Sequence, residues 1–171
     1  MKKMVSRDHP LQKYFKQVVH HTLEDDLGVR GQGDVEAYLA DLLLAFLHRE
    51  GLFTIRDATG RPLETVSEML AEGDIRLNAD SFDREREVHR HIGDFLLFLS
   101  GLFPESLVRS GGEGSLDSAV RQGKVSYHIV SSFEHGPYTD EAATFRKLSD
   151  RFEVWREGLY LLRSDFEGFA A

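Results

Sequence analysis

Apolar residues in the C-terminal part of the chain recur at alternating steps of three and four positions, and this restricts how the chain can fold. Such spacing places the side chains in one line along an α-helix that packs against other helices. We call this line the C-terminal seam, and its members are Phe145, Leu148, Phe152, Trp155, Leu159 and Leu162. Because the seam spans fewer than three heptads, it predicts packing in a bundle and not an extended coiled coil.

Helical spacing of apolar residues also covers most of the remaining sequence. It predicts helices that begin near residues with the side chains typical of helix starts, namely Pro10, Asp34, Thr65, Asp80 or Ser81, Ser115 and Thr139. Gly28, Gly51 and Pro104 are expected to end helices, with a turn over residues 105–109. We therefore predict a single all-α domain of residues 1–171, folded as a bundle of five to six helices.

Residues 52–63 break the helical pattern. Phe53 and Ile55 alternate with polar neighbours, and residues 57–62 have the composition of a turn. This predicts a small β-hairpin or extended excursion that packs on the helices, because an isolated hairpin is only marginally stable.

Composition excludes several functional classes. The chain has 29 acidic residues against 21 Lys and Arg, a net charge of −8, so it lacks the basic surface that nucleic-acid binding requires. It has no cysteine, which excludes disulfides and thiolate metal sites. It has neither an apolar stretch typical of a signal peptide nor one long enough to cross a membrane. We expect a cytoplasmic protein that binds neither nucleic acid nor membrane.

Histidines paired with acids provide the main hint of chemistry. The apolar line of the helix near residues 82–103, followed backwards, passes through His89 and Glu85, so both side chains are expected to face the core. A buried carboxylate needs a partner or a metal ion. Together with His20, His21 or His128 from neighbouring helices, the pair could bind a divalent transition metal such as Zn, Fe or Mn.

Two other interpretations of these histidines are open. Glu85 and His89 can form a hydrogen-bonded pair with a purely structural role, or they can lie on a solvated face. The Glu-x-x-His spacing of di-iron bundles is absent.

The sequence contains no signature of catalysis, and whether it is an enzyme is undecided. The favoured hypothesis is a helical protein that acts by binding or self-association, as a homodimer through the C-terminal seam. The alternative is a helical bundle that binds a metal or small ligand through inward-facing Glu and His residues. Such a bundle could also be an enzyme.

Overall fold

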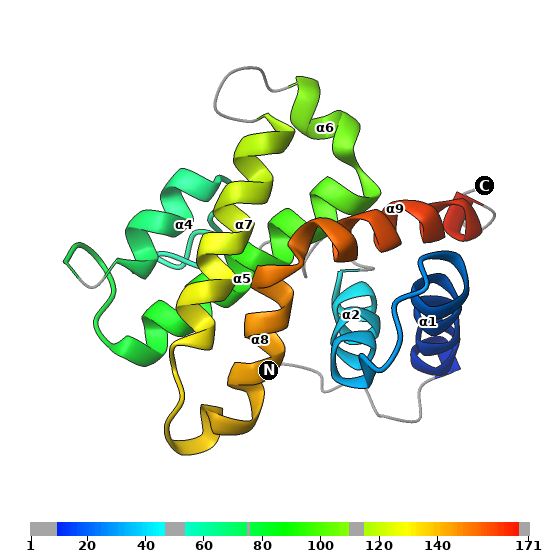
Figure 1. The fold of residues 1–171 in the computed structure, drawn as a ribbon. Helices are drawn as coiled ribbons and strands as arrows, with labels where there is room; N and C mark the ends of the chain where they lie inside the picture. The colour runs from blue at the N-terminus through cyan, green and yellow to red at the C-terminus, as the bar shows by residue number, and fades with distance from the viewer. Residues whose placement is uncertain (1–9, 47–53, 75, 110–114, 168–171) are drawn as a thin grey trace.

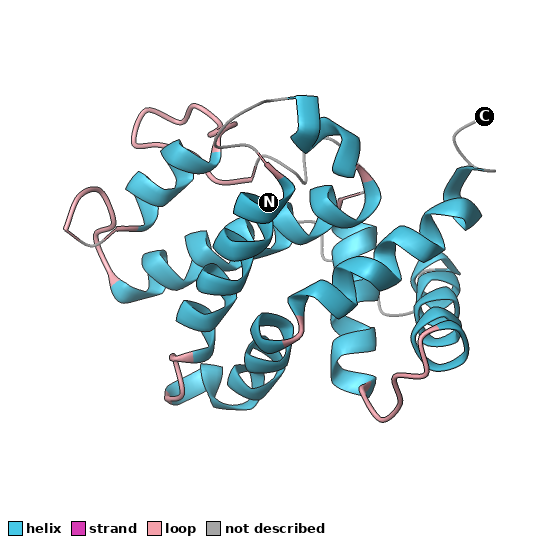
Figure 2. Cartoon of the chain, turned by 45° about the horizontal axis from the view of Figure 1, so that its top comes forward, coloured by secondary structure: helices cyan, strands magenta, loops and turns pink. Residues whose placement is uncertain are grey.

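The structure, a computed structural model, is all-helical. It describes residues 10–46, 54–74, 76–109 and 115–167, and no strand occurs among them (Figures 1 and 2). Its elements are α1 (Pro10–His21), the π-helix η1 (Thr22–Asp26), α2 (Gly33–Ala45), α4 (Val66–Gly73), α5 (Phe82–Leu102), α6 (Pro104–Arg109), α7 (Leu116–Ser131), the 3-10 helix η3 (Gly136–Tyr138), α8 (Thr139–Asp150) and α9 (Phe152–Glu167).

The long helix α5 lies at the centre of the fold. It packs against α7 and α9, with α4 on one side and the α1–α2 pair on the other (Figure 1). Close packing of α5 on α7 depends on Gly93, because a Cβ atom there would lie 2.6 Å from the ring of Tyr127. The sequence predicted that α5 begins at Asp80 or Ser81, and Ser81 is its N-cap. The ends of its apolar line, Phe82 and Phe103, are exposed, although the sequence pattern placed them in the core.

The prediction of an all-α fold is confirmed, but the predicted number of five to six helices is wrong. The described residues contain eight α-helices. One additional helix, α6, replaces the turn expected after Pro104, since proline is well suited to a first helical turn. The other arises because the C-terminal helix is divided at Arg151 into α8 and α9, and the indole of Trp155 donates to the carbonyl of Lys147 across this break.

The C-terminal seam lies inside the protein. All six of its side chains are 0–2% exposed and belong to the core cluster. They contact the other helices of the same chain, and Gly123 on α7 leaves room for the ring of Phe152. The seam therefore offers no surface to a second copy, and the homodimer stays a prediction.

The predicted β-hairpin is not formed in the described residues of segment 52–63. A single bridge joins Arg56 to Pro62, and the backbone N–H of Leu63 donates to the carbonyl of Ile55. Proline has no N–H to extend a ladder. The loop is instead closed by Asp57, whose carboxylate accepts from the backbone N–H of Thr59. Residues 52 and 53 lie outside the described residues.

Helix caps agree with the sequence at some positions and differ at others. Thr65 forms the expected capping box with Glu68, and Ser115 is the N-cap of α7. Asp34 and Thr139 are not N-caps, because each lies within the first turn of its helix.

The carboxylate of Asp34 instead joins α2 to α8. It accepts hydrogen bonds from Thr144 Oγ1 at 2.9 Å and Lys147 Nζ at 3.0 Å. Desolvation opposes ionisation of this carboxyl, but the Lys147 and Thr144 bonds outweigh it and lower the pKa of Asp34.

Among the described helices, none combines the length and the hydropathy needed to span a membrane.

Candidate functional site

The five residues predicted to bind metal are not gathered into one site. His89 is buried on α5, but its partner there is Ser126 of α7, whose Oγ lies 3.1 Å from Nδ1. Glu85 is only half-buried, and His128 is exposed on α7. In the described part of the chain, neither Glu85 nor His89 belongs to a group of three potential metal ligands.

His89 is a buried structural histidine. Its neighbour Ser126 is fully buried and also accepts a hydrogen bond from Gln122 Nε2 at 3.0 Å. Burial disfavours the charged imidazolium and lowers the pKa of His89, although the negative charge of Asp74 acts in the opposite direction. The structural interpretation left open by the sequence paired His89 with Glu85, whereas the hydrogen-bond partner of His89 in the structure is Ser126.

A different group of potential metal ligands forms where α1 meets α2. His20, Glu24 and Glu36, which we call the ligand triad, each contribute one ligand atom, and these atoms lie within 4.8 Å of one another. His20 Nδ1 is 2.9 Å from Glu36 Oε2, and His20 Nε2 is 3.4 Å from Glu24 Oε2. It is the one such group among the residues that the structure describes.

Local helix geometry assembles the triad. Glu24 lies in the π-helix η1, where the Leu27 N–H donates to the carbonyl of Thr22, five residues earlier. Single π turns are frequent at functional sites. Helices α1 and α2 run in opposite directions, because Gln12 pairs with Asp41 while His20, further along α1, pairs with Glu36 in the first turn of α2.

Charge and burial differ among the three side chains. His20 is 56% exposed, Glu24 28% and Glu36 13%. The hydrogen bond to Glu36, followed by the charges of Glu36 and Glu24, raises the pKa of His20. The second oxygen of Glu36, Oε1, is buried and has no hydrogen-bond partner among the described residues. A buried carboxylate oxygen without a partner is costly.

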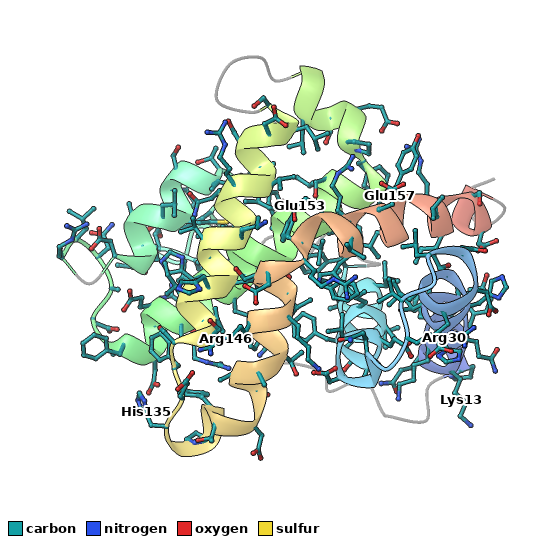
Figure 3. The ribbon with its side chains drawn as sticks, viewed as in Figure 1. Lys13, Arg30, His135, Arg146, Glu153 and Glu157 are labelled. Atoms are coloured by element: carbon teal, nitrogen blue, oxygen red, sulfur yellow. The ribbon has the colours of Figure 1, made fainter. Side chains whose placement is uncertain are left out.

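A hollow of about 340 Å³ adjoins the triad. Its lining includes two triad members together with residues of α1 and the start of α2: Lys16, Gln17, His20, Gly33, Glu36 and Ala37. No hydrogen bond or ion pair holds the ammonium group of Lys16 within the described chain. Lys13 and Arg30 also project from the α1 side of the molecule (Figure 3).

A second polar cluster surrounds α5. Asp94 Oδ1 accepts hydrogen bonds from Tyr38 at 2.6 Å and Tyr127 at 2.7 Å, and Tyr38 Oη also lies 3.3 Å from Arg90 Nε. Burial and the charge of Asp94 raise the pKa of both phenols, so they remain protonated donors.

Arg86 belongs to the same face of α5. Its guanidinium lies over the ring of Tyr138 at 3.9 Å and pairs with Glu141 at 2.7 Å. These bonds pair charges between packed helices and join α5 to α2, α7 and α8, although Arg86 Nε is buried without a hydrogen-bond partner among the described residues. We assign the cluster a structural role.

Sequence reasoning identified His20 and noted that Glu24 follows it by one helical turn, but it missed Glu36. No local spacing could reveal this residue, because it reaches His20 from another helix. His21, by contrast, pairs with Asp25 at 2.7 Å and lies outside the triad.

Comparison with protein-family models, curated proteins and solved structures finds no match, so the function of this chain is inferred from its own side chains.

Proposed function

We propose that this protein binds one divalent transition-metal ion through His20, Glu24 and Glu36. The observation that supports the proposal is the convergence of one nitrogen and two carboxylate ligands from two helices within 4.8 Å. Glu36 Oε2, which faces His20, is the oxygen available to the ion, and the buried Oε1 gains a partner only if Glu36 binds through both oxygens.

The ligand set suits the metals anticipated from the sequence. Imidazole nitrogen and carboxylate oxygen are common ligands of Zn, Fe and Mn, at distances of roughly 2.0–2.2 Å for zinc. Ligands of one zinc ion lie about 3–4 Å apart. His20 faces Glu36 with Nδ1 and Glu24 with Nε2, so the exposed imidazole or Glu24 has to reorient before all three side chains bind one ion.

The favoured hypothesis from the sequence, self-association through the C-terminal seam, has lost its support because those side chains form the core. The metal-binding alternative is retained, with a different set of residues. Only His20 is common to the predicted and proposed ligand sets. A cytoplasmic location and the absence of nucleic-acid or membrane binding stay predictions.

Isothermal titration of the full chain with zinc chloride tests this proposal. We expect one zinc ion per chain, with affinity reduced at least about tenfold in His20→Gln and Glu36→Gln. His21→Gln is the matched control, because His21 is the next residue, is similarly exposed and pairs with its own carboxylate, Asp25.

Far-UV circular dichroism and thermal unfolding would establish that all three variants fold. Absence of saturable zinc binding to the wild type would refute the proposal. So would an equal loss of affinity in His21→Gln, since this result would indicate nonspecific attraction of zinc to an acidic surface.

A further inference from the structure

We propose that the metal centre and Lys16 together bind the carboxylate group of a small organic acid in the hollow between α1 and α2. This inference rests on the proposed metal site and assigns the class of ligand that the site takes. It follows from the position of Lys16, from the open coordination of the metal and from the charge of the assembled site.

Lys16 precedes His20 by four residues on α1, so the two side chains share one face of the helix. Both line the hollow. Lys16 is exposed and pairs with no carboxylate of the described chain. Its ammonium group is therefore available to an anion that enters from solvent.

The triad supplies three protein ligands, and a tetrahedral zinc-type ion has four positions. A site with three protein ligands keeps a position for water or a substrate. Among the lining residues Gly33 and Ala37 add little side-chain volume, which leaves the space beside His20 and Glu36 open. The hollow of about 340 Å³ is open to solvent, so it suits a small ligand held by a few polar contacts.

Charge determines which anion fits. A divalent cation neutralises the carboxylates of Glu24 and Glu36, and Lys16 then adds a single positive charge to the site. A monoanionic carboxylate balances this charge, whereas a phosphate dianion would leave an excess of negative charge. Carboxylate oxygens also bind both partners directly, one oxygen to the metal and the other to the ammonium.

The visible absorption spectrum of the cobalt(II)-loaded full chain tests the inference, with sodium acetate as the probe. Cobalt replaces zinc in such sites and its spectrum reports on exchange of its ligands. We expect a saturable spectral change on addition of acetate at constant ionic strength. Lys16→Met should weaken acetate binding about tenfold without weakening cobalt binding.

Lys13→Met is the matched control, because Lys13 lies one turn earlier on the same exposed surface of α1 and does not line the hollow. It should leave acetate binding unchanged. A cobalt-loaded protein whose spectrum ignores acetate would overturn the inference and leave the metal site intact. Equal effects of the two lysine substitutions, or tighter binding of inorganic phosphate than of acetate, would also overturn it. Failure to bind cobalt at all would overturn the metal site itself.

Discussion

The phenol of Tyr127 donates a hydrogen bond to Asp94, with 2.7 Å between the phenolic oxygen and Oδ1, in the contact between α7 and α5. Tyr127 is fully buried. Tyr127→Phe removes this donor and should lower the free energy of unfolding by about 1 kcal/mol. Urea denaturation followed by circular dichroism measures the change. Tyr160→Phe, at an exposed position of α9, should change stability by less than about 0.5 kcal/mol.

Gly93 should not tolerate a larger side chain. A Cβ atom at this position would lie 2.6 Å from the Tyr127 ring, which is packed in the core and cannot move away freely. We expect Gly93→Ala to lower stability by about 1–3 kcal/mol. Gly33→Ala is the control, since its Cβ would meet nothing within 4 Å. Equal stabilities of the two variants in urea would contradict the close packing of α5 on α7.

Burial of His89 predicts a loss of stability in acid. Its folded-state pKa is lowered from the ordinary value of 6.5, so the unfolded chain binds a proton more readily than the folded chain does. This contribution to stability is complete above pH 6.5 and declines as the pH falls below it. His20, whose folded-state pKa is raised, acts in the opposite direction: its contribution is complete below pH 6.5 and is lost as the pH rises through the folded-state value.

Comparing His89→Gln with the wild type at each pH separates the two histidines, because His20 is present in both proteins. The destabilisation caused by His89→Gln should be largest at neutral pH and should shrink toward pH 5. His128→Gln, at an exposed position, should change stability by less than about 0.5 kcal/mol. A destabilisation by His89→Gln that is constant between pH 5 and 8 would be inconsistent with a neutral buried imidazole.

The C-terminal seam should determine stability and not assembly. Leu162 is 2% exposed, whereas its neighbour Leu161 is 39% exposed. We expect Leu162→Ala to lower the free energy of unfolding by about 2–5 kcal/mol and Leu161→Ala to lower it by less than about 1 kcal/mol. Light scattering should give the same molar mass for both variants and the wild type. A dimer that dissociates only in Leu162→Ala would restore the seam as an interface.

Metal removal should lower thermal stability. Zinc at a hundred times its dissociation constant stabilises a folded protein by about 2.7 kcal/mol if the unfolded chain does not bind it. Differential scanning calorimetry should therefore show a higher Tm with zinc, which EDTA reverses. Glu36→Gln should reduce this difference to about half or less, because a site at least about tenfold weaker gives at most about 1.4 kcal/mol at the same zinc concentration. An unchanged Tm in the wild type at saturating zinc would argue against the triad as a ligand set of the folded state.

Much of the fold could be predicted from apolar spacing, since side chains three and four positions apart must share a buried face. The seam is the strongest example, and its burial follows from its pattern. The division at Arg151 could not be predicted, because the apolar spacing continues from Leu148 to Phe152 without a change of phase. The β-hairpin predicted for residues 52–63 was wrong. Alternation of apolar and polar residues indicates a strand, but Pro62 has no N–H to extend the ladder beyond one bridge.

The candidate site was predictable only where it is local. His20 and Glu24 lie one turn apart, so their proximity follows from helix geometry. Glu36 belongs to another helix, and its approach to His20 depends on how α1 and α2 pack. The error concerning Glu85 has a similar origin: the exposed Phe82 shows that the buried stripe of α5 does not continue to its first turn.

Asp34 and Glu36, two residues apart in the first turn of α2, bind to different parts of the chain. Asp34 is tied to Lys147 of α8, whereas Glu36 is tied to His20 of α1. Side chains of α1 and α8 thus meet at one helical turn of α2, and together with the single core cluster that spans α1 to α9 they oppose separate melting of either part. Cooperativity should accordingly extend over the whole molecule, and heating should produce a single transition.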